Sequence, residues 1–457
     1  MQNHRGKFVG DNEVMSMLSI LLNVRKLSKA DTTTIRPIQL DRLKQLVKHS
    51  RRHSPYFSDL YKNLPEVITD ISQLPITTKP ELMNNFDNWV TDKEINLRDL
   101  RQFVSKKETI GDLYLRRYYV CTTSGTTGHP AVIVHDLHSR KVYYAIGFFR
   151  NLLPRLSLPD IFTRVKMAAV LATDGHFLGY TTLINRAKKS KLRQRLQKVF
   201  SVFTPVPLLV KGLNEFQPDI LGGYPTMIYL LAKEQLQKRL NIHPYLITSS
   251  GETLHPYMRK TMEDAFGAVV LNSYGSSEVP GLTSECKYHK LHVNTDWYIL
   301  EVEDTESILV TNLSNFVQPI IRYQMNDYVV VESEPCRCGS KYPVVSVVGR
   351  DDEILTFLTE NGESIDILPM AISTIAEESK GVYQSQIVQK TNKHIIVRIK
   401  PIEGEDAAMV KDGVKANMEE FFAAHGLSHV MVELAEESPE INPKSGKFRS
   451  VVTLVKK

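Results

Sequence analysis

The chain has 457 residues, of which 42% are hydrophobic and 24% are charged, and its net charge is +6. This length suggests two or three domains of a globular protein, and the modest, dispersed charge does not indicate a nucleic-acid partner. Four cysteines are too few for a disulfide framework, and no run approaches the roughly 20 apolar residues that span a bilayer. We therefore expect a cytoplasmic protein without a membrane span.

The first 60 residues are expected to be mostly helical and polar, with a break at Ser54-Pro55. The apolar run 15–24 follows acidic residues and lacks a small-residue cleavage site, so it belongs to an N-terminal helix and not to a signal peptide. Residues 70–89 are expected to form a loop leading into a short helix, with Pro80 in its first turn.

From about residue 118 onward, predicted strands alternate with predicted helices. The predicted strands are apolar and rich in β-branched residues, and they cover 131–134, 269–272 and 308–310. The predicted helices are longer and cover 138–153, 226–239 and 256–266. This alternation predicts an α/β protein. The densest basic run, 186–198, favours a solvated helix face over a landing site for a phosphorylated co-substrate such as coenzyme A.

A domain boundary is predicted near Gly349-Arg350-Asp351-Asp352. A helix over 369–378, strands over 384–389 and 395–400, a helix over 407–424 and a strand over 450–455 follow it. We therefore expect a large multi-sheet N-terminal domain, residues 1–349, and a smaller, mobile α+β C-terminal domain, residues 350–457.

A loop rich in glycine and hydroxyl residues, 124–128 (SGTTG), lies between two predicted strands and follows Thr122 and Thr123. Glycine permits close backbone approach and positive φ, so hydroxyls and backbone N–H groups can face a phosphate. The spacing matches neither GxxxxGK[ST] nor a strand-linked GxGxxG. The loop therefore indicates another way of holding ATP.

Four further segments carry chemical groups: ITSSGETL (247–254), LNSYGSSEVP (271–280), PIIRYQMND (319–327) and NPKSGKFR (442–449). The second combines Tyr274, hydroxyls and Glu278 within five residues, which suits base stacking, phosphate binding and Mg²⁺. Asp327 could accept hydrogen bonds from both hydroxyls of a ribose. Lys447 lies on a glycine-containing turn before a strand, so its amine can be presented at a surface.

Taken in order, these segments resemble the adenylate-forming superfamily, which includes acyl-CoA synthetases, adenylation domains and luciferases. The chain looks most like the phenylacetate–CoA ligase group, with its capsule-biosynthesis relatives. That likeness rests on SSGETL before YGSSE, on the form PIIRYQMND, on Cys-x-Cys-Gly before the boundary and on SPYFSDLY near the N-terminus. In such enzymes a carboxylate attacks the α-phosphate of ATP, pyrophosphate leaves, and a thiol then attacks the acyl-adenylate.

The resemblance implies a nucleotide site with ATP as cofactor. Tyr274 would stack on adenine, and Asp327 would hold the ribose with Arg350 beside it. The implied nucleotide-binding set is Thr123, Ser124, Gly125, Thr126, Thr127, Gly128, Ser250, Gly251, Glu252, Tyr274, Gly275, Ser276, Asp327 and Arg350.

The resemblance also implies the catalytic groups. Ser277 would touch the α-phosphate, Glu278 would ligate magnesium, and Lys447 would bridge the attacking carboxylate and the α-phosphate. A fixed cation and magnesium suit a transition state that gathers negative charge around one phosphorus. Asp352 matches the family's hinge, where rotation of the C-terminal domain would exchange active-site faces.

The phosphate loop departs from the family in lacking a lysine beside its proline, because His129 and Ala131 occupy the two flanking positions. A protonated His129 could partly substitute. The departure motivates one alternative, a non-catalytic homologue that binds nucleotide without turnover.

A possible zinc site is formed by Cys286, His292, Cys336 and Cys338, a Cys₃His set that matches positions used in some members of the resembled group. The alternative is a group of packed thiols without metal. Cys121 is expected to be a core residue.

We expect an AMP-forming carboxylate ligase that passes a small-molecule acyl group to coenzyme A. The alternative acceptor is an acyl-carrier protein, an amine or a hydroxyl in a pathway such as polysaccharide synthesis. Relatives in this family often pair, which leaves a homodimer open.

Overall fold

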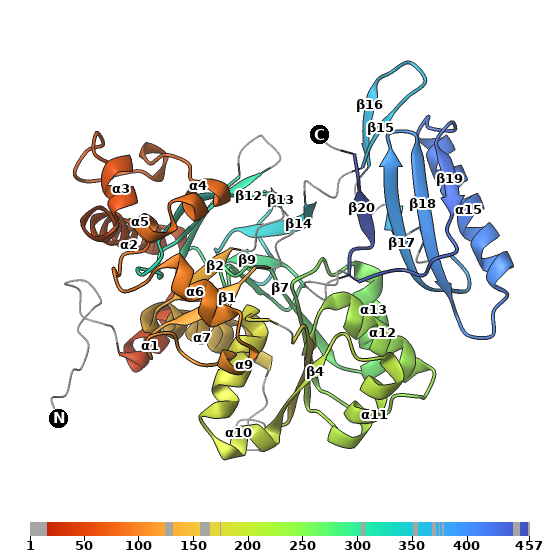
Figure 1. Ribbon diagram of the computed structural model, residues 1–457, viewed down its shortest axis with the longest axis horizontal. Coiled ribbons are helices and arrows are strands. Elements are labelled where there is room, and N and C mark those ends of the chain that lie inside the picture. Colours follow the sequence, from red (N-terminus) through yellow and green to blue (C-terminus); the bar gives the residue numbers. More distant parts are fainter. Residues whose placement is uncertain are drawn as a thin grey trace.

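The computed structural model describes residues 16–123, 131–155, 165–173, 175–302, 307–350, 355–367, 372–373, 375–376, 379–441 and 448–455 (Figure 1). Several predicted site residues lie outside these ranges: Ser124, Gly125, Thr126, Thr127, Gly128, His129, Asp352 and Lys447. Arg350 is described only as the end of a strand. Their proposed roles stay predictions.

The N-terminal part is helical, as expected, and its helices begin at identifiable caps. Ser54 ends α2 and caps α3 by accepting from the backbone of Phe57, with Pro55 in the first turn. Thr78 caps α4 in the same way, with Pro80 in its first turn. The elements are α1 Met17–Leu27, α2 Thr32–His53, α3 Pro55–Leu60, η1 Ile71–Gln73, α4 Lys79–Asn84, α5 Phe86–Trp89, α6 Leu97–Val104 and η2 Lys107–Thr109.

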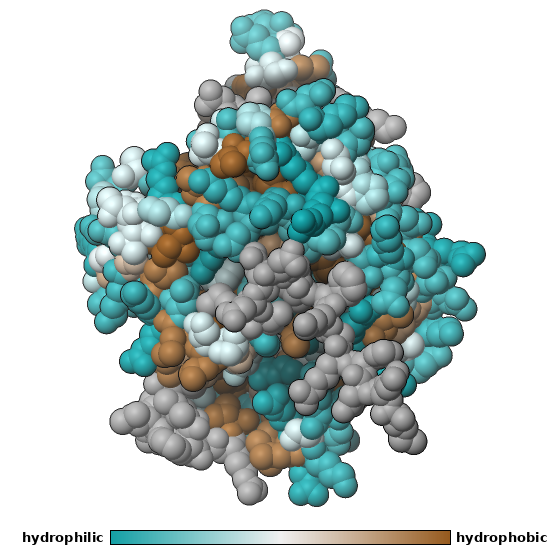
Figure 2. All heavy atoms as spheres, turned by 90° about the vertical axis from the view of Figure 1, so that its left-hand side faces the viewer, coloured by the Kyte–Doolittle hydropathy of each residue, from teal (hydrophilic) through white to brown (hydrophobic). Residues whose placement is uncertain are grey.

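The face of the molecule that carries these helices is mainly hydrophilic, with hydrophobic side chains scattered among polar ones (Figure 2). Among the described residues, no helix combines the length and apolar character needed to cross a bilayer.

A five-stranded parallel sheet, in the order β4-β3-β5-β6-β7, forms the α/β part that the sequence predicts. Its strands are β3 Met167–Leu171, β4 Gln197–Ser201, β5 Ile220–Gly223, β6 Leu246–Ser250 and β7 Val269–Ser273. Helices accompany it: α9 Leu178–Lys188, α10 Lys191–Leu196, α11 Val206–Phe216, α12 Pro225–Leu236 and α13 Pro256–Phe266. Ligands of such sheets bind beyond the carboxyl ends of the strands, and β6 and β7 end at the Ser/Gly/Glu and Tyr/Gly/Ser/Glu segments.

Three predicted helices or helix faces differ from the structure. The helix expected over 138–153 is α7 Leu137–Ile146, followed by a π-helical segment η3 Gly147–Leu152 and η4 Leu153–Arg155. Helix α12 ends before residue 239, because Lys238 adopts a left-handed conformation with φ 61°. The basic run 186–198 is divided between α9, α10 and β4 and is not one helix face.

Antiparallel strands complete the N-terminal part. The hairpin β1 Tyr119–Thr122 and β2 Val132–His135 brackets the predicted phosphate loop. One sheet has the order β10-β11-β12 and another the order β13-β14-β9-β8. These strands are β8 Thr283–Glu285, β9 Leu291–Val293, β10 Tyr298–Val302, β11 Ile308–Asn312, β12 Ile320–Met325, β13 Asp327–Val331 and β14 Val344–Arg350.

Residues after 354 form a smaller α+β unit with a hydrophobic core of its own, on one side of the molecule (Figure 1). A sheet in the order β19-β18-β17-β20 packs on α15 Ala407–Ala424, whose bounds match the prediction. Its strands are β17 Val382–Thr391, β18 His394–Pro401, β19 Met431–Leu434 and β20 Val451–Thr453, next to the hairpin β15 Leu355–Leu358 and β16 Ser364–Ile367. The helix predicted over 369–378 lies largely outside the described residues, and the boundary at 349/350 stays a prediction.

A buried ion pair joins the helices to the antiparallel sheets. The guanidinium of Arg150 in η3 donates to both carboxylate oxygens of Asp296, at 2.8 and 2.9 Å, and their side chains are 5% and 0% exposed. Arg150 also donates to Asn294 at 2.8 Å and to the hydroxyl of Tyr342 at 3.0 Å. The buried charges are therefore paired and hydrogen-bonded, which their desolvation requires.

Candidate adenylation site

A cleft of about 1800 Å³ opens beyond the carboxyl ends of β6 and β7. The segments of the described chain that line it include residues 78–80, 122–123, 177–180, 250–256, 272–278, 323–327 and 448–451. Four of the five chemical segments singled out in the sequence therefore meet here through their described residues; the fifth, residues 124–128, follows directly on Thr123.

The residues predicted for adenine and ribose lie together. The hydroxyl of Tyr274 donates to Oδ2 of Asp327 at 2.7 Å, although the two residues are 53 positions apart. Strand β7 delivers Tyr274, and β13 begins at Asp327, whose backbone pairs with that of Arg350 on β14. An aromatic ring and a carboxylate thus share one wall of the cleft.

Glu278 is 6% exposed, and both its backbone carbonyl and its carboxylate accept hydrogen bonds. The amide of Asn312 donates to the carbonyl of Glu278 at 3.0 Å, and the hydroxyl of Tyr323 donates to Oε1 at 3.3 Å. Burial and the nearby Glu278 carboxylate raise the pKa of Tyr323, so Tyr323 stays a donor. A carboxylate held at the cleft wall is suited to a hard cation.

Sequence reasoning missed a buried chain of hydrogen bonds behind Ser277. The Asn312 amide donates to the Tyr143 hydroxyl at 2.8 Å, this hydroxyl lies 3.3 Å from Nδ1 of His135, and Nε2 of His135 lies 2.9 Å from the carbonyl of Ser277. Burial lowers the pKa of His135 to about 4, so its ring is neutral at pH 7. A neutral ring that donates from Nε2 accepts at Nδ1, which gives every member of the chain a partner.

Thr123 closes the base of the phosphate loop. Its N–H donates to the carbonyl of Ala131 at 3.0 Å, and its Oγ1 accepts from the N–H of Ala131 at 2.9 Å. The ammonium of Lys79, at the start of α4, donates to the same Oγ1 at 3.3 Å. A cation therefore reaches the base of the loop from a segment more than 40 residues upstream, which no local motif signals.

Glu252 connects the cleft to the C-terminal residues. Its Oε2 accepts from the hydroxyl of Thr226 at 2.6 Å, and its Oε1 accepts from the backbone N–H of Phe448 at 2.8 Å. Phe448 directly follows Lys447 in the sequence. Next to Glu252, Ser250 and Gly251 line the cleft at the end of β6, and Gly251 has φ +89°.

The turn after β7 requires glycine at its second position. A Cβ on Gly275 would lie 2.8 Å from the carbonyl oxygen of Val279, a contact that real side chains do not make. Ser276 accepts from the N–H of Glu278 at 3.3 Å, which tightens the same turn. The local sequence therefore sets the backbone that presents Ser277 and Glu278.

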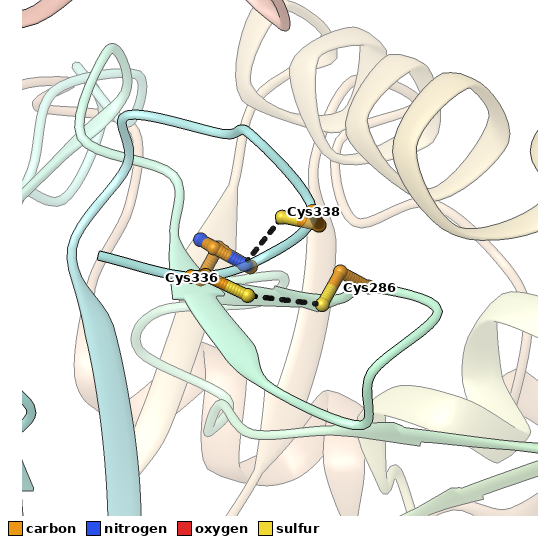
Figure 3. A group of neighbouring side chains, drawn as sticks. Cys286, Cys336 and Cys338 are labelled. Carbon is orange, nitrogen blue, oxygen red and sulfur yellow. Dashed lines mark hydrogen bonds between the residues drawn. The ribbon is translucent and has the colours of Figure 1, made fainter. Parts of the chain in front are cut away.

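The four predicted zinc ligands also converge. Three thiols from two loops face one another (Figure 3), and the ligand atoms of Cys286, His292, Cys336 and Cys338 all lie within 4.8 Å of one another. The Sγ atoms of Cys286 and Cys336 are 3.7 Å apart, close to the roughly 3.8 Å that a tetrahedral site with Zn–S bonds of about 2.3 Å produces.

The orientation of His292 fits the same site. Its Nδ1 lies 2.9 Å from the carbonyl of Tyr342, which accepts the ring proton, and its Nε2 lies 3.3 Å from Sγ of Cys338. A ring fixed by such a backbone contact offers the other nitrogen as a ligand.

Comparison with known proteins assigns one segment of the chain to a family. Residues 115–305 match the AMP-binding enzyme family. The resemblance drawn from its motifs is thus confirmed, and so is an α/β fold with a large N-terminal part and a smaller C-terminal one.

Three similar proteins span most of the chain. Protein CapK of Staphylococcus aureus is 25% identical over 385 residues, 79% of this chain and 77% of CapK. A phenylacetate-coenzyme A ligase of Thermus thermophilus is 21% identical over 346 residues, 70% of this chain and 71% of the ligase. The crystal structure of 2-hydroxyisobutyryl-CoA ligase in the postadenylation state aligns with a TM-score of 0.68 at 18% identity. The alignment covers 94% of this chain and 91% of the ligase chain.

We predict that His135 makes stability depend on pH. Its pKa falls from an ordinary value of 6.5 to about 4 on folding, so the unfolded chain takes up the proton first and stability is lost as pH falls through this window. The lowering corresponds to roughly 3 kcal/mol. The difference in unfolding free energy between wild type and His135→Gln should therefore shrink between pH 7 and pH 4, measured by urea denaturation.

Other buried histidines are common to both proteins and cancel in that difference. An equal difference at pH 7 and pH 4 would contradict a neutral, buried His135.

Proposed function

We propose that this enzyme activates a carboxylic acid with ATP as the acyl-adenylate, releases pyrophosphate and transfers the acyl group to coenzyme A. The observation that carries the proposal is the meeting of Tyr274, Asp327, Glu278 and Phe448 in one cleft. The phenylacetate-coenzyme A ligases among its relatives support coenzyme A as the acceptor. A cytoplasmic location, where ATP and coenzyme A are available, belongs to the same proposal.

Each described group has a role in the first step. Tyr274 stacks on adenine, Asp327 accepts from the ribose hydroxyls, and Ser277 donates to the α-phosphate. Glu278 would hold Mg²⁺, which neutralises phosphate charge when bound. Because Glu252 anchors the N–H of Phe448, the neighbouring Lys447 is proposed to enter the cleft from the C-terminal residues.

Lys79 is proposed to supply the cation that the phosphate loop lacks. Neither His129 nor Ala131 offers a permanent charge, whereas the Lys79 ammonium lies at the base of the loop, 3.3 Å from Oγ1 of Thr123. A cation positioned there stabilises the departing pyrophosphate. This contact favours an active enzyme over a non-catalytic nucleotide-binding homologue.

A structural zinc ion is proposed to bind Cys286, His292, Cys336 and Cys338. The donor set and the spacing of its atoms support it. The site would join the loop after β8 to the loop between β13 and β14, and so support the strand that begins at Asp327.

The function is tested by pyrophosphate release with a panel of aromatic and aliphatic carboxylic acids. At least one acid should stimulate release, and Lys447→Ala should reduce it by orders of magnitude while leaving thiolysis of preformed adenylate largely intact. Thioester formation with coenzyme A is then compared with transfer to an amine and to a carrier protein. Release that no acid stimulates would contradict the proposal, and a Lys447→Ala defect confined to thiolysis would refute the role of that lysine.

Lys79→Met should lower the rate constant of pyrophosphate release by roughly a hundredfold, as loss of one transition-state donor does, and Lys79→Arg should retain part of it. The KM for the carboxylic acid should change little. Lys62→Met is the matched control, because Lys62 is exposed and pairs with Asp59 on the surface. Equal rates for the Lys79→Met and Lys62→Met variants would exclude Lys79 from the phosphate site.

Metal analysis tests the zinc proposal. Purified protein should contain about one zinc ion per chain, lose it on Cys336→Ser and keep it on Cys121→Ala, since Cys121 is buried in β1 away from the cluster. The site would be contradicted if the purified protein contained no zinc and the three clustered cysteines were freely alkylated in the native state.

A further inference from the structure

A cluster of four cations lies outside the cleft, where the basic run of the sequence folds back on α7. It consists of Arg140 on α7, Arg186 on α9, Lys189 at the end of α9 and Arg193 on α10, and is called the basic cluster below. None of these residues lines the cleft.

The two arginines nearest the sheet are partly buried against tyrosine rings. The guanidinium carbon of Arg140 lies 2.9 Å from the centroid of the Tyr119 ring, and that of Arg186 lies 6.0 Å from the centroid of the Tyr144 ring. Burial lowers the pKa of Arg140 to about 10. Burial and the neighbouring Arg193 also lower the pKa of Arg186, and burial, Arg140 and Arg193 lower that of Lys189. Arg193 therefore repels both Arg186 and Lys189, and Arg140 repels Lys189.

No aspartate or glutamate of the described chain balances these charges. Within the described residues, Arg140, Arg186, Lys189 and Arg193 form no ion pair. The pKa values of the first three are shifted by burial, by neighbouring cations and by the two tyrosines, and not by a carboxylate. The adjacent Lys188, by contrast, pairs with Asp112 at 2.7 Å. Arg140 and Arg186 are partly buried, whereas Lys189 and Arg193 are exposed. Partly desolvated charges are normally paired, so a counter-charge from a ligand suits the two arginines, and the exposed cations can reach the same ligand.

The basic cluster lies within reach of the cleft along two elements. Gly179 lines the cleft, and Arg186 follows it by seven residues, two helical turns on the same face of α9, or roughly 10 Å. Tyr119 precedes the cleft residue Thr122 by three residues of strand β1, also roughly 10 Å. The extended pantetheine arm of coenzyme A is longer than either distance.

We propose that the basic cluster is a second binding site, which takes a phosphate monoester, and that this phosphate is the one on the nucleotide end of coenzyme A. Arginine guanidinium groups bind phosphate oxygens in pairs, which suits a doubly charged monoester. The ring of Tyr144, which is 46% exposed, stacks on Phe148 and adjoins Arg186, so an aromatic surface borders the phosphate site. The assignment to coenzyme A rests on the proposed acyl transfer. The proposal of a phosphate site is independent of that function.

Calorimetric titration with adenosine 3′,5′-bisphosphate, and separately with inorganic phosphate, tests the site. Arg186→Gln and Arg193→Gln should each weaken bisphosphate binding by at least about tenfold, the loss of a charge-assisted hydrogen bond. Arg195→Gln is the matched control, since it removes the same charge from the exposed surface of α10. Arg193 is exposed, so its replacement leaves folding intact even where the variant at the partly buried Arg186 is destabilised.

Kinetics distinguish the source of the phosphate. Wild type should use coenzyme A with a KM about tenfold below that for dephospho-coenzyme A, and Arg193→Gln should abolish this preference without changing acid-dependent ATP–pyrophosphate exchange. Loss of bisphosphate binding together with equal use of both acceptors by wild type supports a phosphate site but overturns coenzyme A as its source. Bisphosphate binding as tight in Arg186→Gln and Arg193→Gln as in Arg195→Gln overturns the site.

An absence of ATP–pyrophosphate exchange in wild type would refute the proposed function instead. The bisphosphate titration would still decide whether the basic cluster binds phosphate.

Discussion

The buried ion pair between Arg150 and Asp296 fixes the geometry on which both candidate sites depend. Arg150 follows α7, and its guanidinium also holds Asn294, whose side-chain amide in turn donates to the carbonyl of Gly281 at 2.8 Å. Gly281 follows the turn that presents Ser277 and Glu278, and Asn294 lies two residues after His292 of the metal cluster. Loss of Asp296 would leave the buried guanidinium of Arg150 without its carboxylate, whereas loss of Arg150 would leave Asp296 only the longer contact with Arg42 at 4.0 Å, so removing either charge is costly.

A second polar network transmits that geometry to the cleft. Helix α7 carries Tyr143, which links Asn312 on β11 to His135 on β2, and His135 holds the carbonyl of Ser277. Networks of this kind stabilise a single arrangement only when every member has a partner. Here the neutral ring of His135 meets that condition, because it can donate from one nitrogen and accept at the other. The proposed phosphate and magnesium ligands therefore stand on a scaffold that is buried, neutral and fully hydrogen-bonded.

Positive charge lies beyond both ends of strand β1. Lys79 of α4 contacts Thr123, which directly follows β1, and Arg140 of α7 lies over the ring of Tyr119, where β1 begins. Arg186 of α9 lies over the ring of Tyr144 on α7. All three contacts are long-range. Local sequence around residues 124–131 indicates a missing cation, and the contact of Lys79 with Thr123, just before the loop, supplies a candidate for it.

The sequence by itself determined those features that short-range rules control. Helix 256–266 was predictable to the residue because proline begins it and Gly267, with φ +62°, ends it, and the turn at Gly275 follows from the space its backbone needs. The ordered motifs also sufficed for the resemblance to AMP-binding enzymes, which the match over residues 115–305 supports. Only the tertiary structure decided that Tyr274 meets Asp327, that Glu252 holds Phe448, that Lys79 reaches Thr123 and that His135 supports Ser277. Each of these contacts joins residues 44 to 196 positions apart, and no local preference encodes a contact that exists only after separate elements have packed.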